Sequence, residues 1–496
     1  MEAKPKGKYI PPHKRTLQET TCEPVSQSKF EKFLQGGSTT KCLSEWGKRD
    51  RRNGNIDEQS FEDGEKLFTK QFMGSNLNLY EDIPIEVSES FPEMGDFSDC
   101  EIHECLLQNI KRLGYTTPTP VQRYAIPISL ARRDIMSCAQ TGSGKTASFL
   151  VPTIAKMLSE RPPSSPSLRT AHPVSCILAP TRELSIQIYE EALKFSHQSG
   201  IRIVTVYGGA DPKLQSKELY RGADIVVATP GRLIDFINRG RVSLSLVKYL
   251  IIDEADMMFD MGFEPQIRTI LETMKENKRE TIMCSATFPL SIQDLASQFM
   301  NDYIFLAIGK VGAAVQHITQ KFFYVQEDEK QVYLKNVLKD LHGLILIFTE
   351  TKVMADNLNE FLFNIGKKSN TIHGNKNQVE RERALNDFKS SKEAILVATD
   401  VASRGLDIPN VSNVINFDFP GNIIDYTHRI GRTGRIGNEG FSVSFVNEKN
   451  RGLFKDIFTI LVENNQEIPD WLERSHRSDV SSYRRTRNRR FYRNNY

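Results

Sequence analysis

Short apolar runs alternate with longer amphipathic stretches through most of this chain. Runs of this kind occupy residues 174–179, 203–207, 224–228, 281–284, 344–348, 394–398 and 414–417. Uninterrupted runs are typical of strands buried on both faces of a parallel sheet, and the stretches between them are long enough for crossover helices. The pattern therefore predicts an α/β fold, in which mostly parallel sheets carry helices on both faces.

One of the intervening stretches shows the helical period directly. Its apolar residues fall on a single helical face, at Met354, Leu358, Phe361, Leu362 and Ile365. A stripe of this kind is typical of a helix that packs on a hydrophobic core, so we predict a core helix here and assign it no chemistry.

Polar segments divide the alternating pattern into two regions. A chain of 496 residues is also too long for one hydrophobic core. The arm at the N-terminus is polar, charged and without clear periodicity, as disordered segments are. We therefore expect a disordered arm over residues 1–75, a first domain over 76–308, a linker over 309–320, a second domain over 321–475 and a basic tail over 476–496.

The basic tail stands out against a chain whose net charge is only +3. Residues 478–496 contain six arginines and one aspartate, interleaved with four aromatic residues. This composition is typical of a non-specific RNA tether that combines charge with stacking. It is equally typical of a solubilising disordered tail, and both interpretations stay open.

The overall composition excludes several classes of protein. The chain is 39% hydrophobic and 26% charged, as ordinary soluble proteins are. Its apolar runs are far shorter than the roughly 18 residues of a membrane span, and its start lacks the apolar core of a signal peptide. The seven cysteines form no CxxC pair, so neither a zinc site nor a disulfide framework is indicated. We expect a reducing compartment and a cytoplasmic location, with nuclear shuttling left open.

A glycine-rich loop between a strand-like run and a helix-like run predicts nucleotide binding. Its glycines let backbone N–H groups turn toward an anion, Lys145 supplies a positive charge for the β- and γ-phosphates, and the Thr146 hydroxyl is placed to bind Mg²⁺. Ala139 occupies the position of the usual first glycine. The residues expected to contact the nucleotide are Ala139, Gln140, Thr141, Gly142, Ser143, Gly144, Lys145 and Thr146.

A second strand-like run occupies residues 247–252, and an acidic cluster follows it directly. Nucleotide hydrolysis needs an acidic residue at the tip of a strand beside the phosphate loop, and Asp253 fits that role as a metal ligand. Glu254 is placed to orient or deprotonate the attacking water. The loop and the acidic cluster together predict an enzyme that hydrolyses a nucleoside triphosphate with Mg²⁺.

The Asp-Glu-Ala-Asp cluster at 253–256 resembles the signature of DEAD-box RNA helicases. Other motifs of that family occur in the family's order on both sides of this cluster. Those before it lie at Phe97 with 114–122, 179–184, 208–209 and 229–233, and those after it lie at 285–287, 378–381, 398–407 and 428–435. The resemblance implies two tandem RecA-like domains. It also implies an RNA-dependent ATPase that couples hydrolysis to local, non-processive unwinding of RNA.

The resemblance also implies roles for single residues. Gln122, whose amide can donate to and accept from a base edge, would recognise adenine together with Tyr115 and Phe97, and Asp407 would reach the ribose. Lys145, Asp253 and Glu254 would act with two arginine fingers from the second domain, Arg432 and Arg435. Ser285, Thr287 and His428 would couple the ATP and RNA sites. Backbone and 2′-hydroxyl contacts to RNA would come from Pro180, Thr181, Arg182, Gly209, Thr229, Arg232, Arg381, Thr399 and Arg404.

Four further stretches resemble the Ded/Belle branch of the family. They lie at residues 8–15, 80–87, 260–268 and 466–472. That branch works on mRNA in translation initiation, which implies initiation factors as partners, and the related germline vasa proteins remain an alternative. The chain departs from the family at Met257, where an arginine is usual, so the domain contact of that arginine does not carry over.

Three functions remain in play at this point. The first is a helicase that acts as a monomer on RNA of any sequence, and the second is an ATP-gated RNA clamp that scaffolds a ribonucleoprotein with little unwinding. A DNA translocase is the third, although the Gln122 motif and the final Asp256 of the acidic cluster disfavour it. A metabolic kinase is excluded by the two-domain order of the motifs.

Overall fold

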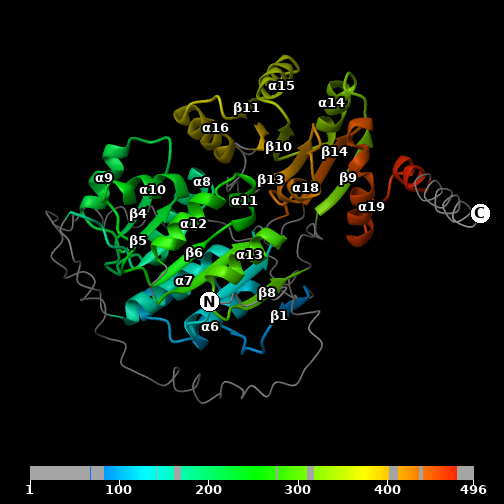
Figure 1. Ribbon diagram of the computed structural model, residues 1–496. Coiled ribbons are helices and arrows are strands. Elements are labelled where there is room, and N and C mark those ends of the chain that lie inside the picture. The colour runs from blue at the N-terminus through cyan, green and yellow to red at the C-terminus, as the bar shows by residue number, and fades with distance from the viewer. Residues whose placement is uncertain are drawn as a thin grey trace, which may run out of the picture. The chain divides into compact units, whose positions relative to one another are not determined.

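The computed structural model describes residues 68, 83–140, 142–160, 169–274, 278–309, 318–391, 393–400, 411–434 and 440–477. Two compact units follow each other, the first taking in Tyr80–Ala139 and Ser143–Val311 and the second Gly312–Tyr496. Each unit is built around its own sheet (Figure 1). The predicted arm, apart from Phe68, most of the predicted linker and nearly all of the basic tail lie outside the described residues.

Eight strands form one sheet in the described part of the first unit, in the order β1-β8-β2-β7-β6-β3-β5-β4. The seven strands from β8 to β4 run parallel, and β1 pairs antiparallel with β8 at one edge. The strands are β1 (Ile85–Val87), β2 (Ile135–Ala139), β3 (Ser175–Leu178), β4 (Ile203–Val206), β5 (Ile225–Ala228), β6 (Tyr249–Ile252), β7 (Glu280–Ser285) and β8 (Ile304–Ile308).

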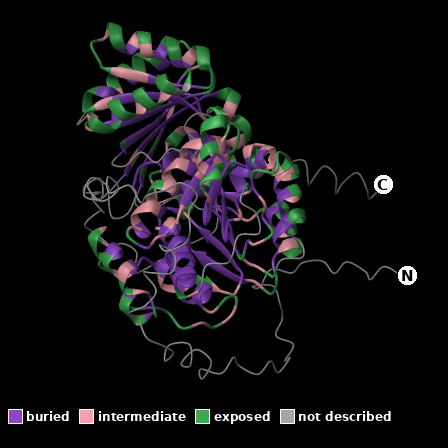
Figure 2. Cartoon of the chain, turned by 90° about the vertical axis from the view of Figure 1, so that its left-hand side faces the viewer, coloured by how far each residue is buried: buried purple, intermediate pink, exposed green. Residues whose placement is uncertain are grey.

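Helices cover both faces of this sheet. This is seen from successive strand residues, which point to opposite faces and belong to different hydrophobic clusters. On β3, Ile177 joins one cluster with α5 to α8, whereas Cys176 and Leu178 join the other with α9 to α13. Figure 2 shows the strands buried and the helices exposed on their outer sides. The helices are α5 (Glu104–Arg112), α6 (Pro120–Leu130), α7 (Lys145–Ser159), α8 (Arg182–Phe195), α9 (Pro212–Tyr220), α10 (Pro230–Asn238), α11 (Ala255–Asp260), α12 (Glu264–Thr273) and α13 (Leu290–Phe299).

The described part of the second unit has a six-stranded parallel sheet, in the order β11-β12-β10-β13-β14-β9. Its strands are β9 (Ile318–Tyr324), β10 (Leu344–Thr349), β11 (Ser369–Ile372), β12 (Ala394–Thr399), β13 (Val411–Asn416) and β14 (Gly440–Val446). Its helices are α14 (Lys330–Asp340), α15 (Lys352–Asn364), α16 (Gln378–Ser390), α18 (Ile423–Ile430) and α19 (Phe454–Glu463).

The predicted fold class is confirmed, since both units are mostly parallel α/β structures. The predicted core helix is α15, where Leu358 and Leu362 are fully buried and Met354, Phe361 and Ile365 pack against the same cluster. Within the described ranges, no helix has the length and hydropathy that a membrane crossing requires.

The order of the parallel strands decides where function can lie, because ligands bind at the carboxyl ends of strands in such sheets. The phosphate loop follows β2, the acidic cluster follows β6 and the Ser285–Thr287 motif follows β7. Since β2, β7 and β6 are neighbours in the sheet, these three motifs lie next to one another at the carboxyl ends of the strands.

Candidate active site

The phosphate loop turns sharply from β2 into α7. Gly142 and Gly144 have φ angles of 78° and 93°, in the left-handed region that glycine adopts without a steric penalty. Lys145 is buried, and its Nζ donates to the Ala139 carbonyl at 2.7 Å, so the ammonium lies over the loop. The amino terminus of α7 therefore presents backbone N–H groups and a positive charge to an anion. Thr141 lies outside the described residues.

Gln122 joins the predicted adenine motif to this loop. Its Nε2 donates to the Gly144 carbonyl at 3.1 Å, and its Oε1 accepts from the Thr119 N–H at 3.0 Å. The second contact belongs to a capping box at the start of α6. Adenine recognition by Gln122 stays a prediction. The structure adds that the same amide holds the backbone of the phosphate loop.

Tyr115 and Phe97 are both packed against other aromatic rings. The Tyr115 ring lies 6.1 Å from Phe97 in an edge contact and 5.6 Å from Phe195 in a tilted one. Asn109 donates to the carbonyls of Phe195 at 2.9 Å and His197 at 2.8 Å, which fixes the end of α8 behind these rings. Their contact with adenine stays a prediction, and the supporting role of Phe195 was not visible in the sequence.

The acidic cluster places two carboxylates at the tip of β6. Burial raises the pKa of Asp253 to about 7, and the nearby Lys145 ammonium opposes that rise. Glu254 has a φ of 50°, an uncommon backbone conformation for a residue with a side chain. Its Oε2 is buried and has no hydrogen-bond partner among the described residues. Unpaired buried oxygens and backbone strain of this kind cluster at catalytic sites.

The oxygen donors of this site fit Mg²⁺. A hard cation with oxygen ligands suits the Asp253 carboxylate and the Thr146 hydroxyl, which is half-buried at the start of α7. A bound cation would also offset the cost of burying the ionised Asp253. Bound Mg²⁺ would supply charge compensation for the phosphates.

Asp256 connects the acidic cluster with the motif after β7. Its Oδ2 accepts from the N–H groups of Ala286 at 3.1 Å and Thr287 at 2.8 Å, and from the Thr287 hydroxyl at 2.9 Å. The structure therefore brings Thr287 to the acidic cluster. The Ser285 hydroxyl is buried and finds no hydrogen-bond partner in the described ranges, so its coupling role stays a prediction.

The predicted RNA contacts of the first unit lie at the carboxyl ends of β3, β5 and β4, which are neighbours in the sheet. Thr181, next to Pro180, caps α8 by accepting from the Leu184 N–H at 3.3 Å. The Arg182 guanidinium lies 4.7 Å from the centre of the Tyr207 ring. The Thr229 hydroxyl accepts from the Gly208 N–H at 3.3 Å, beside the predicted contact residue Gly209.

Gln215 is a positioning residue that the sequence analysis missed. Its Oε1 accepts from the Tyr207 N–H at 3.3 Å and from Arg232 Nη1 at 3.2 Å, and its Nε2 donates to the Tyr207 carbonyl at 3.1 Å. One amide thus holds the strand end before Gly208 and orients a predicted RNA-binding arginine. The signal available in the sequence was a glutamine one helical turn before Leu219, on the same helical face.

In the second unit, Thr399 ends β12, Arg381 lies on α16, His428 lies on α18 and the buried Arg432 follows α18. Arg404, Asp407 and Arg435 lie outside the described residues. The predicted roles of all seven residues stay predictions.

Arg429, which the sequence analysis did not single out, fixes the helix before Arg432. Its Nε and Nη2 contact the Asp400 carboxylate at 2.5 and 2.6 Å, and its Nη1 donates to the Asp418 carbonyl at 2.6 Å. The guanidinium is buried beside the Phe348 ring, 4.9 Å from its centre. This bidentate pair joins α18 to the end of β12 and so orients the segment that carries Arg432.

Close backbone packing limits the turn after Arg432. A Cβ added at Gly440 would lie 2.7 Å from the Gly434 nitrogen and 2.9 Å from the Thr433 side chain. We expect Gly440→Ala to displace this turn together with the predicted arginine finger Arg432, and so to lower the ATPase kcat about 10-fold. Gly452→Ala is the matched control, since an added Cβ there meets no atom within 4 Å. Equal kcat in the two variants would contradict the expectation.

Comparisons with known proteins agree with this geometry. The family described as DEAD/DEAH box helicase matches residues 119–295, and the helicase conserved C-terminal domain matches residues 329–437. The yeast DEAD-box splicing factor Prp28 is 35% identical over 81% of this chain and 94% of its own, with a TM-score of 0.46.

The chain is also similar to solved structures that contain RNA. Mss116p bound to ssRNA and AMP-PNP is 27% identical over 79% of this chain and 88% of its own, with a TM-score of 0.66. S. cerevisiae Dbp5 bound to RNA and ADP BeF3 is 27% identical over 77% of this chain and 98% of its own, with a TM-score of 0.66.

Proposed function

Because this chain belongs to the DEAD-box RNA helicase family and is an RNA-dependent ATPase with helicase activity, we propose that it separates short RNA duplexes locally and without processive movement. One observation carries the proposal. In the first sheet, the ATP motifs follow β2, β7 and β6, and the predicted RNA contacts follow the adjoining β3, β5 and β4. Both ligands would therefore contact the carboxyl ends of the same sheet, so that nucleotide state can influence RNA binding.

The predicted RNA-binding residues after β3, β5 and β4 suit recognition of a sugar-phosphate backbone. Thr181, Thr229, Arg182 and Arg232 offer hydroxyls and guanidinium groups, which bind phosphates and carry no sequence information by themselves. Contacts to 2′-hydroxyls distinguish RNA from DNA. We therefore propose binding to RNA of any sequence. RNA in the Mss116p and Dbp5 structures supports RNA binding as such.

For hydrolysis we propose that Lys145 and Thr146 hold the phosphates and Mg²⁺, that Asp253 organises the metal and that Glu254 acts on the attacking water. Arg432 and Arg435 would stabilise charge on the γ-phosphate. Phosphoryl transfer depends on positioning and charge stabilisation, and the hydrogen bonds of Asp256 to Ala286 and Thr287 hold the acidic cluster in place.

We further propose a role in mRNA translation initiation, in the cytoplasm and with initiation factors as partners. The support is the resemblance of four stretches to the Ded/Belle branch, which includes residues 260–268 and 466–472. A germline role like that of vasa proteins is the alternative. Association with initiation factors in cell extracts, compared with association with germline ribonucleoproteins, distinguishes the two.

Strand separation tests the proposed mechanism. A short RNA duplex with one labelled strand is mixed with the full chain and ATP, AMP-PNP or no nucleotide, and a DNA duplex of the same sequence serves as control. We expect ATP-dependent separation that declines steeply with duplex length, and ATPase stimulation by RNA only. Tight ATP-dependent RNA binding with negligible turnover would favour the clamp, whereas equal stimulation by DNA would favour a translocase.

A further inference from the structure

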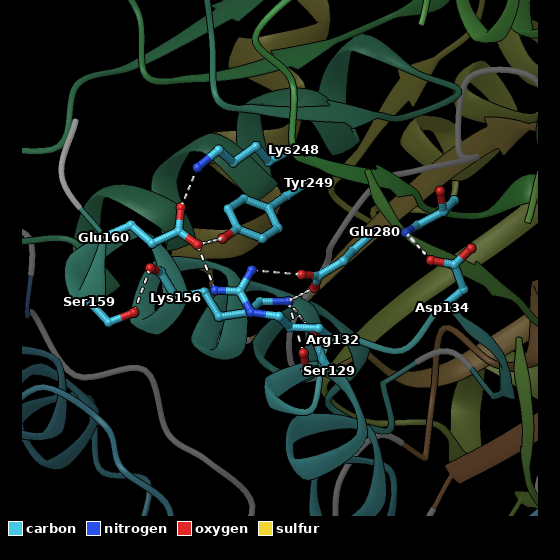
Figure 3. Close-up of polar contacts among 10 residues, drawn as sticks. Ser129, Arg132, Asp134, Lys156, Ser159, Glu160, Lys248, Tyr249 and Glu280 are labelled. Carbon is cyan, nitrogen blue, oxygen red and sulfur yellow. Dashed lines mark hydrogen bonds and ion pairs between the residues drawn. The ribbon is translucent and has the colours of Figure 1, made fainter. Parts of the chain in front are cut away.

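An ion network with a buried lysine at its centre lies in the first unit, at the amino ends of β6 and β7 and so opposite the ATP motifs (Figure 3). At its centre is Lys156, whose side chain is 3% exposed. Its Nζ donates to the carbonyl and hydroxyl of Ser129, each at 3.0 Å, and contacts Glu280 Oε2 at 2.5 Å. The Tyr249 ring lies 4.7 Å away. All three N–H bonds of the ammonium therefore have partners.

Arg132 and Glu160 extend this network. Arg132 Nη1 lies 3.2 Å from Glu280 Oε1, and its Nη2 lies 2.6 Å from Glu160 Oε1. Glu160 also accepts from the Tyr249 hydroxyl at 3.0 Å and from Lys248 Nζ at 2.6 Å. Figure 3 shows these side chains converging from separate helices and strands. Each carboxylate of the network thus joins at least two cations or donors.

Every element that enters the network carries an ATP motif at its other end. Helix α6 begins with the Gln122 motif and ends at Ser129 and Leu130, and α7 begins at the phosphate loop and carries Lys156 in its last turn. Tyr249 and Glu280 are the first residues of β6 and β7, which lead to the acidic cluster and to the Ser285–Thr287 motif. At about 3.3 Å per strand residue, the network lies roughly 13–17 Å from the motifs.

Stability alone is a weak explanation for this arrangement. Taking charges out of water costs free energy, and well-packed apolar side chains often replace a buried ion pair without loss. Burial lowers the pKa of Lys156, whereas the Glu280 carboxylate opposes that change. Apolar side chains would not fix the position of one helix or strand along the next, because hydrophobic contacts are not directional.

We propose that Lys156 and Glu280 are positioning residues that set the register of α7 against α6, β6 and β7 and thereby the nucleotide affinity of the ATP site. The inference rests on the ATP site proposed above. A shift of these elements along one another would move Lys145, Asp253 and Gln122 relative to one another, without removing any group that contacts the nucleotide.

The test replaces the central pair by apolar residues of similar length, in the full chain. We expect Lys156→Met with Glu280→Met to remain folded, with a thermal midpoint within a few degrees of wild type, while ADP affinity falls and the KM for ATP rises about 10-fold. The matched control is Arg268→Met with Glu264→Met, which removes an ion pair of 2.8 Å on α12, a helix outside the ATP motifs. The control should leave ADP affinity and KM unchanged.

A folded double variant with wild-type ADP affinity and KM would overturn the proposal and leave the network a purely structural one. If the double variant does not fold, Glu280→Gln keeps an acceptor for Lys156 and removes the charge. Its ADP affinity should then fall by a smaller factor, and an unchanged affinity would again overturn the proposal. A wild-type chain that binds no ADP would instead refute the assigned ATP site, and this role with it.

Discussion

Replacing Glu254 with glutamine should reduce the RNA-stimulated kcat by about 100- to 10,000-fold, the range over which a general base contributes. The substitution preserves the shape of the side chain but removes its basicity. Glu254 Oε2 is buried without a hydrogen-bond partner among the described residues, so the carboxylate is placed to receive a proton from water. The backbone at φ 50° holds the side chain in this place, and glutamine imposes the same steric demand.

Steady-state ATPase rates with and without RNA measure this effect. RNA binding in the presence of AMP-PNP should be retained, because Glu254 lies in the ATP motifs and the predicted RNA contacts follow β3, β5 and β4. Glu190→Gln, an exposed glutamate on α8, is the matched control for loss of one negative charge. Wild-type turnover in Glu254→Gln would remove Glu254 from the mechanism.

Gly144→Ala should lower ATP affinity by about 100-fold, since a strained backbone position of this kind costs roughly 1–3 kcal/mol and a steric clash adds to it. Gly144 has a φ of 93°, and an added Cβ would lie 2.6 Å from Gln122 Nε2 and 2.9 Å from Thr119 Oγ1. The new methyl group would therefore separate Gln122 from the Gly144 carbonyl and distort the loop that presents N–H groups to the phosphates.

Gly222→Ala is the control for backbone strain outside the phosphate loop. Gly222 has a φ of 94°, but an added Cβ there meets no atom within 4 Å. Both variants thus carry the same backbone strain, and only Gly144→Ala adds the contact with Gln122. Titration with a fluorescent ADP analogue and thermal unfolding are the measurements. If the two variants bind ADP equally well, the contact between Gln122 and the phosphate loop has no part in nucleotide binding.

The fold class could be predicted from the sequence because buried parallel strands leave a simple trace. The runs at 174–179 and 281–284 are apolar without alternation, and the structure buries them as β3 and β7 between two layers of helices. The phosphate loop and the acidic cluster were recognisable for a related reason. Their residue types are dictated by anions and metal ions, and their position by the strand ends.

Contacts over long sequence distances could not be predicted. Arg429 shares a sequence motif with Arg432 and Arg435, and only the folded chain shows that it is buried against Asp400 and Asp418 and has a structural role. Lys156 was a visible anomaly, a lysine between Ala155 and Met157 in an otherwise apolar stretch. Its partner Glu280 lies 124 residues away, so only the folded chain shows why a charge is tolerated there.

The antiparallel strand β1 has a consequence for anyone who shortens this chain. Ile85–Val87 pairs with β8, Ile85 opposite Ile308 and Val87 opposite Leu306, and so occupies the outer side of an apolar strand. A truncated version that begins after Val87 would leave the N–H and C=O groups of β8 open to a strand from another molecule. Self-association of such a fragment would then reflect an unprotected sheet edge and not the behaviour of the intact enzyme.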